Sequence, residues 1–303
     1  MRNTRQRPGL LAMTSVPRTL VFSALFCSLG LVPARVAAGP VPDQEQTVKT
    51  NSPWVTGYYP AQNRIEPVAS IPWSKYTEIN NFAAAAGVGD DGRGNSTVNL
   101  HYLTPAEMSQ FVTRAHALGK KAVVTIKDND QHLEAFSQNT APEVIEAFVS
   151  SIQALVISNA YDGVDIDWEA KVTVGPYVNL LIRLRRALGD AKLITIAVGN
   201  WSQLDRAAAQ AQAFVDHINV MCYDMDDTRS YAWHNAALLQ NGDQDKMTCD
   251  WRVRGVHAGG RFQKQDRHRY SLLWAALDRR NRTAPAQCFQ FRRMDQLPGL
   301  GHR

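Results

Sequence analysis

Short apolar runs alternate with amphipathic stretches along the middle of the chain. The runs are five to eight residues long, which is typical of strands buried on both faces. The stretches between them repeat apolar residues every three or four positions, as helices do. The predicted strands are Val55–Tyr59, Glu78–Ala85, Lys121–Ile126, Gly163–Trp168, Leu193–Val198 and Ile218–Tyr223. The predicted helices are Pro105–Leu118, Ala141–Ser158, Pro176–Leu188 and Leu204–Phe214.

The first 38 residues have the pattern of a secretory signal peptide. Arginines precede an apolar run from Leu20 to Val32, and small residues ending at Ala38 provide a cleavage site. The run is short for a membrane span, so a short membrane anchor is the weaker alternative. We therefore expect residues 1–38 to be removed and the protein to be secreted, extracellular or periplasmic, without membrane attachment. Residues 39–53 are polar and contain prolines, and we expect them to form an N-terminal arm.

The regular order of strand then helix predicts an α/β fold with a parallel sheet. The 265 residues after Ala38 approach the ~250 residues of a (β/α)8 TIM barrel, and a doubly wound open sheet is the structural alternative. The predicted strands account for the chain only up to about residue 227. After Trp251 the one apolar run, Ser271–Leu277, lies among arginines. We therefore predict a barrel that is incomplete at strands seven and eight.

Charge divides the chain at about residue 250. Residues 39–250 contain 16 basic and 25 acidic side chains, whereas residues 251–303 contain 12 basic and 3 acidic ones. Eleven of those 12 basic residues are arginine, and an arginine-rich segment is able to bind nucleic acid. Neither aromatic interleaving nor a binding motif accompanies it, so we expect no nucleic-acid partner.

The segment Tyr161–Glu169 places acidic residues at alternate positions of a predicted strand. Asp165, Asp167 and Glu169 should therefore share one face, spaced about 6–7 Å apart, while the apolar residues between them face the helices. Like charges this close do not all ionise cheaply, so at least one proton is retained near neutral pH. A proton held on Glu169, at the end of the strand, is suited to protonating a glycosidic oxygen.

Two other interpretations fit three neighbouring carboxylates. One is a solvent-exposed edge strand, but the apolar residues on both sides favour a buried strand. The other is a divalent metal site, but no further Asp, Asn or His is placed to complete its ligands. The three cysteines after residue 38 show neither zinc-site spacing nor a disulfide framework. We therefore expect no metal and no cofactor.

The segment DGVDIDWE also resembles the DGxDxDxE signature of family 18 glycoside hydrolases, with every defining acid present. The segment VTGYYP, which contains Tyr58, resembles the first strand of that family. The segment VMCYDM, which contains Met221, Tyr223 and Asp224, resembles its sixth-strand motif, and WHNAAL resembles the segment that often follows. These motifs occur in the family's order between residues 55 and 239.

The resemblance implies a (β/α)8 barrel and a retaining, substrate-assisted cleavage of β-1,4-linked N-acetylglucosamine. Glu169 would protonate the leaving oxygen, while the substrate's own acetamido carbonyl attacks the anomeric carbon. Asp167 would orient the acetamido group, Asp165 would share a proton with Asp167, and Tyr223 would hydrogen-bond the acetamido oxygen. The substrate-binding residues implied are Tyr58, Met221 and Asp224.

One segment departs from the family pattern. The third strand usually ends in Ser-x-Gly-Gly, whereas this chain has Thr125-Ile126-Lys127-Asp128. Thr125 still offers a hydroxyl, but the glycines that allow close backbone approach are absent. The departure leaves chitin, chito-oligosaccharides and N-glycan cores open as substrates.

Residues 248–303 are interpreted as translated out of frame. Reverse translation of Arg261–Asp278, taken one base later, permits ASKSKIGIGIPFYGRRW, which resembles a seventh barrel strand of the family. The same frame has a stop at Met247-Thr248, so the slip would follow it. We therefore assign the catalytic barrel to residues 54–247. Exposed edges at the missing strands would leave this chain poorly folded and weakly active or inactive.

The sequence thus predicts a secreted, monomeric enzyme of the chitinase type that acts on chitin or another polysaccharide containing N-acetylglucosamine. An endo-β-N-acetylglucosaminidase acting on glycans or peptidoglycan is the first alternative. A non-catalytic chitin-binding lectin, or an inactive truncated product, is the second. The presence of Glu169 favours an enzyme, because such lectins typically lose the acid.

Overall fold

The computed structural model describes residues 54–61, 67–199, 202–225, 233–239, 247–258 and 270–273. The predicted signal peptide, the N-terminal arm and most of the arginine-rich segment lie outside these residues. No helix within them is both long enough and apolar enough to cross a membrane.

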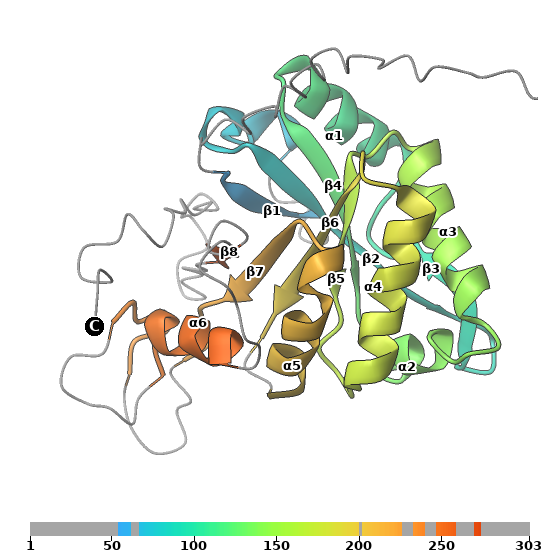
Figure 1. The fold of residues 1–303 in the computed structure, drawn as a ribbon. Helices are drawn as coiled ribbons and strands as arrows, with labels where there is room; N and C mark the ends of the chain where they lie inside the picture. Colours follow the sequence, from blue (N-terminus) through green and yellow to red (C-terminus); the bar gives the residue numbers. More distant parts are fainter. Residues whose placement is uncertain are drawn as a thin grey trace, which may run out of the picture. The chain divides into compact units, whose positions relative to one another are not determined.

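One sheet forms the centre of the fold (Figure 1). Its strands are β1 (Thr56–Pro60), β2 (Glu78–Val88), β3 (Gly94–Asn99), β4 (Lys121–Lys127), β5 (Gly163–Asp167), β6 (Leu193–Val198), β7 (His217–Met221) and β8 (Tyr270–Leu273). The order is β1-β2-β4-β5-β6-β7-β8, and all neighbours in that order run parallel. Only β3 is antiparallel, and it pairs with β2 outside that order.

Helices connect the parallel strands and pack on the outside of the sheet (Figure 1). They are α1 (Pro105–Ala117), α2 (Ala135–Asn139), α3 (Ile145–Ser158), α4 (Val174–Leu188), α5 (Ser202–Ala211) and α6 (Cys249–Ala258). The start of α1 illustrates how the sequence sets a boundary. Thr104 accepts a hydrogen bond from the Glu107 amide at 3.3 Å and donates one to the Glu107 carboxylate at 2.7 Å, and Pro105 supplies a φ suited to the first turn.

The predicted α/β fold and the incomplete barrel are both confirmed. The predicted strands correspond to β1, β2, β4, β5, β6 and β7, which curl into half of a barrel. Within the described residues β8 pairs with β7, and no pairing joins β8 to β1. No strand is predicted after residue 227, so the four residues of β8 are a correction. The sequence pattern likewise does not predict β3 or α6.

The two faces of β5 show why the fold is layered. Successive side chains of a strand point to opposite faces, so the apolar residues of β5 face the helices and its acids face the inside of the half-barrel. Trp168 continues the apolar side just beyond the strand. Its fully buried ring stacks on Phe136 and Tyr177, with centroid separations of 5.1 and 5.5 Å. This packing fixes the orientation of the acidic motif.

The first residue of β5 has no room for a side chain. A Cβ at Gly163 would lie 2.2 Å from the Leu193 carbonyl oxygen, which belongs to the backbone of β6. We predict that Gly163→Ala lowers the free energy of unfolding by about 1–3 kcal/mol, because the neighbouring strand would have to shift. Urea unfolding measures this value, and Gly175→Ala, where nothing lies within 4 Å, is the matched control. Equal midpoints for the two variants would contradict the prediction.

Candidate active site

Three acids rise from the interior to the surface at the carboxyl end of β5. Asp165 is fully buried and Asp167 is 8% exposed. Glu169 lies just beyond the last strand residue and is exposed. The carboxyl ends of parallel barrel strands are where active sites of this architecture form. The acids that the sequence predicts to share one face therefore lie at the expected end of the strand.

Side chains from four other strands hold Asp165. Its carboxylate accepts hydrogen bonds from the hydroxyls of Tyr58 (2.9 Å), Thr125 (3.0 Å) and Thr195, and from the Asn219 amide at 3.4 Å. Burial raises the pKa of Asp165, although the hydrogen bonds from Thr195, Tyr58 and Thr125 favour the charged form. Because every one of these neighbours can donate, the site is built to accommodate negative charge on Asp165.

Asp167 differs from Asp165 in the hydrogen bonding of its carboxylate. One of its carboxylate oxygens, Oδ1, is buried and has no hydrogen-bond partner in the described part of the chain. Burial raises the pKa of Asp167 well above its usual value, and the negative charges of Glu169, Asp165 and Asp128 raise it further. Asp167 therefore holds a proton at pH values where an ordinary aspartate is ionised.

Glu169 combines access to solvent with a raised affinity for protons. The residue is exposed at the surface, but enough protein surrounds its carboxyl group that burial raises its pKa. The charges of Asp128 and Asp224 raise that pKa further, whereas Lys127 lowers it. A reachable carboxyl group that keeps its proton is what a general acid requires.

Two tyrosines flank the acids. The Tyr58 hydroxyl donates to Asp165 and accepts a hydrogen bond from the Asn219 side chain at 3.0 Å. Tyr223 follows β7, and burial raises its pKa, as do the nearby charges of Asp167 and Glu169. Both phenols therefore stay protonated as donors beside the carboxylates.

The other two predicted residues lie at the end of β7. Met221 is the last residue of that strand and shares a face with Asn219, whose side chain reaches Asp165. Asp224 is exposed and has a left-handed backbone with φ 54°, and its amide donates to the Asn235 side chain at 3.1 Å. The seven predicted residues therefore lie within or just beyond three strands of one parallel sheet, β1, β5 and β7.

Sequence reasoning missed two of the groups that hold Asp165. Thr195 and Asn219 lie in the middle of apolar strands, β6 and β7, and both are fully buried. A polar residue at an inward position of an otherwise apolar strand is a signal for such a role. The sequence alone did not show that the two residues face the same carboxylate.

The first acid of the motif has a different role. Asp162 precedes β5 at its amino end and accepts hydrogen bonds from Lys121 (2.8 Å), the Ala122 amide (2.9 Å) and His116 (2.8 Å). Burial favours a raised pKa for Asp162, but these hydrogen bonds outweigh it and leave the pKa below its usual value. Asp162 joins β4 to β5 at the end of the sheet opposite the acids, which is a structural role.

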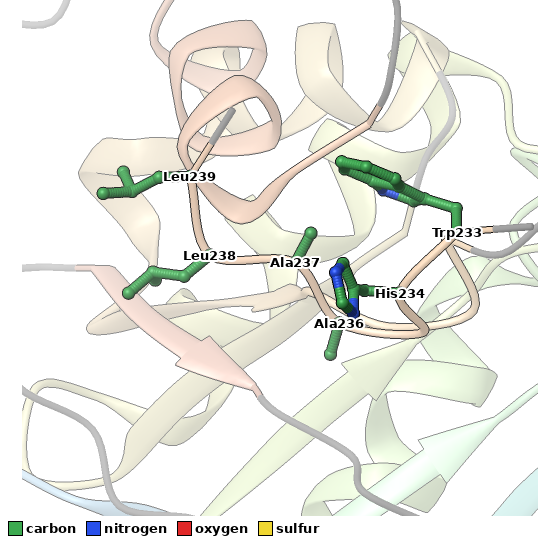
Figure 2. Close-up of a pocket in the computed structure, with 6 residues that line it drawn as sticks. All are labelled: Trp233, His234, Ala236, Ala237, Leu238 and Leu239. Atoms are coloured by element: carbon green, nitrogen blue, oxygen red, sulfur yellow. The ribbon is translucent and has the colours of Figure 1, made fainter. Parts of the chain in front are cut away.

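A separate hollow lies over the segment WHNAAL (Figure 2). Its lining residues are Trp233, His234, Ala236, Ala237, Leu238 and Leu239. The Trp233 indole donates to the Met247 carbonyl at 2.8 Å, and the Cys249 amide donates to the Ala237 carbonyl at 2.8 Å. None of Asp165, Asp167 and Glu169 lines this hollow. The segment therefore packs between the end of β7 and the start of α6.

The metal-binding side chains and thiols of the described residues do not form a second functional site. No group of three or more His, Cys, Asp or Glu side chains is placed there to hold a metal ion. Cys222 and Cys249 are buried free thiols.

Comparison with known proteins gives one family. The family model of Glycosyl hydrolases family 18 matches residues 55–266. A chitinase-like effector of Moniliophthora perniciosa is 27% identical over 191 residues, which are 56% of this chain and 42% of the effector. The chain therefore spans less than half of that curated relative.

Solved chitinases share the fold. The Group IV chitinase of Ostrinia furnacalis superposes with a TM-score of 0.61 at 19% identity, over 73% of this chain and 66% of that one. The Class V chitinase of Nicotiana tobaccum gives a TM-score of 0.57 at 18% identity, over 72% of this chain and 66% of that one. The match of the family model over most of the chain, on a half-barrel that carries DGVDIDWE, shows that this protein belongs to family 18 of the glycosyl hydrolases.

Proposed function

We propose that this protein is a secreted, monomeric glycosidase that cleaves β-1,4-linked N-acetylglucosamine polymers, chitin or chito-oligosaccharides, with retention of configuration. The observation that carries the proposal is the graded set of acids at the end of β5. Asp165 is buried among donors. Asp167 is buried, and one of its oxygens has no hydrogen-bond partner among the residues that the structure describes. Glu169 is exposed and has a raised pKa. Secretion rests on the pattern of residues 1–38.

The substrate class is supported by bound sugars in related structures. A mutant of the Class V chitinase of Nicotiana tobaccum was solved in complex with NAG4, and a mutant Group II chitinase catalytic domain of Ostrinia furnacalis in complex with (NAG)5. A polymer of N-acetylglucosamine carries a carbonyl group on the 2-acetamido substituent of each sugar. That carbonyl oxygen is able to replace a protein nucleophile.

In the proposed reaction Glu169 gives its proton to the glycosidic oxygen as the bond to the anomeric carbon breaks. The acetamido carbonyl oxygen attacks that carbon, which produces an oxazolinium ion. The Asp167 proton passes to Asp165, so Asp167 becomes an anion that accepts the acetamido N–H and balances the positive charge. The ionised Glu169 then takes a proton from water as the water opens the ring.

The remaining residues bind and orient the sugar. Tyr223 donates its hydroxyl to the acetamido oxygen, and Met221 and Asp224 line the same subsite. Tyr58 stays below the acids and holds Asp165 in place through its hydrogen bond of 2.9 Å. No step requires a metal or a cofactor.

Proton NMR of the first products tests this proposal. We expect incubation with a chito-oligosaccharide to release the β-anomer first, because two displacements at the anomeric carbon restore its configuration. A fully deacetylated glucosamine oligomer of the same length is the matched control and should not be cleaved, since it lacks the attacking carbonyl. Initial release of the α-anomer, or equal cleavage of both substrates, would contradict the mechanism.

A second candidate function is chitin binding without turnover. It is favoured by the open half-barrel, in which no pairing joins β8 to β1 within the described residues. Binding of chito-oligosaccharide without any released product would support this candidate. Cleavage of peptidoglycan or of an N-glycan core in preference to chitin would instead indicate an endo-β-N-acetylglucosaminidase.

A further inference from the structure

Asp128 stands where the family pattern has glycine, and it contacts the backbone of the proton donor. It directly follows β4, and its amide donates to the Asp167 carbonyl at 3.2 Å, which extends the pairing of β4 with β5. One oxygen of its side chain, Oδ2, accepts hydrogen bonds from the amides of Glu169 (2.8 Å) and Ala170 (2.7 Å). These amides lie just beyond β5, where the ladder of backbone hydrogen bonds has ended.

A second contact holds the same turn from the opposite side. The Trp168 indole donates to the Ala170 carbonyl at 2.7 Å, and its ring is packed between Phe136 and Tyr177. The backbone on both sides of Glu169 is therefore fixed, by Asp128 toward β4 and by Trp168 toward the helices. An exposed carboxyl group gains a defined position only if its backbone is held in this way.

The second carboxylate oxygen of Asp128 allows the negative charge of this residue to act on the neighbouring acids. Asp128 Oδ1 is buried and has no hydrogen-bond partner among the described residues. Burial raises the pKa of Asp128 to about 6, although the amides of Ala170 and Glu169 favour its charged form. The charged and titratable groups that face it are Lys127, Asp130, Asp167, Glu169 and Tyr177, while Asp224 acts on Glu169 from beyond β7.

We propose that Asp128 is a positioning residue that fixes the backbone of Glu169 and places a negative charge beside its carboxyl group. This inference rests on the proposed function, in which Glu169 must hold a proton until the glycosidic bond breaks. Above about pH 6, where Asp128 is mostly ionised, its negative charge makes loss of that proton less favourable, so Glu169 stays protonated to a higher pH. Asp128 thus replaces the close backbone approach that glycine permits with an anchored carboxylate.

The charge of Asp128 also has a consequence for stability. Its folded pKa of about 6 lies above the ordinary value of 3.8, so between these values the folded protein binds more protons than the unfolded chain. The contribution of this group to stability is therefore greatest below pH ~4 and declines as the pH rises toward 6. Asp128→Asn, which removes the titration, should flatten that decline.

Carboxyl titration by carbon-13 NMR tests the proposal without requiring turnover. The full chain is labelled at the glutamate side-chain carboxyl carbon, and Glu169→Gln assigns the signal. Asp128→Asn keeps an acceptor oxygen for the two amides but removes the charge, so Glu169 should titrate at a lower pH than in the unmodified protein. Asp190→Asn, which removes an exposed carboxylate before β6, is the control and should leave the titration unchanged.

Kinetics provide the second readout. The high-pH limb of kcat against pH should move to lower pH in Asp128→Asn. Asp128→Ala loses both amide contacts, so it should lower kcat on the order of tenfold to hundredfold, with a smaller change in KM. A Glu169 titration identical in Asp128→Asn and Asp190→Asn would overturn the proposal. Absence of hydrolysis by the unmodified protein would refute the proposed function instead, and the NMR titration would still decide the influence of Asp128 on Glu169.

Discussion

Glu169→Gln should lower kcat for chito-oligosaccharide hydrolysis on the order of 10²- to 10⁴-fold. Glutamine keeps the size of the side chain and its capacity to hydrogen-bond, but it has no proton to give to the leaving oxygen. Glu169 is the exposed member of the acidic set, so its carboxyl group is the one that a sugar in the site would meet. Initial rates of oligosaccharide cleavage measure the loss.

Binding should survive the same substitution. Calorimetry with the same oligosaccharide should give a dissociation constant within a few-fold of the unmodified protein, because the acetamido contacts of Asp167 and Tyr223 remain. Asp190→Asn, at the opposite end of the strands, should change neither kcat nor binding. Retention of most of the activity in Glu169→Gln would assign the proton to another group.

Arg252→Ala should lower the free energy of unfolding by about 3–5 kcal/mol, because it breaks a buried ion pair. Arg252 lies on α6 and is 1% exposed. Its guanidinium donates to both carboxylate oxygens of Asp205, at 3.1 and 3.3 Å, and to the Gly199 carbonyl. In the alanine variant the Asp205 carboxylate would still be largely shielded from water but would have no cation beside it. Chemical denaturation at neutral pH measures the change.

The same helix supplies the control. Arg254 pairs with Asp250 one turn away, but its side chain is 72% exposed, so Arg254→Ala should change the unfolding free energy by less than about 0.5 kcal/mol. The double variant Asp205→Leu and Arg252→Met should recover much of the loss, since apolar residues often replace a buried ion pair without cost. Equal destabilisation by Arg252→Ala and Arg254→Ala would show that α6 does not pack as described.

The packing of α6 bears on the hypothesis of translation out of frame after residue 247. Cys249, Val253 and Val256 are buried, and α6 packs against α5. The match to the family model also continues to residue 266. These contacts show that residues 249–256 pack as part of the described fold. The hypothesis itself stays a prediction.

Much of the fold was predictable from local patterns. Strand and helix follow from periods of two and 3.6 residues, which are properties of a short stretch of backbone. The same period of two put Asp165, Asp167 and Glu169 on one side of a strand before any partner was known. β3 and β8 were not predicted because they lack a clear local pattern. β3 is polar and lies largely at the surface, and β8 is only four residues long.

The sequence by itself determined which strand carries the acids and that Asp165 and Asp167 share a face, because side-chain direction in a strand depends only on the alternation of the local backbone. Tertiary structure alone decided what surrounds them. Tyr58, Thr125 and Asn219 meet Asp165 from positions 107, 40 and 54 residues away, and Asp128 meets the amide of Glu169 across 41 residues. Such contacts depend on the register between strands, and that register is fixed only when the strands pair.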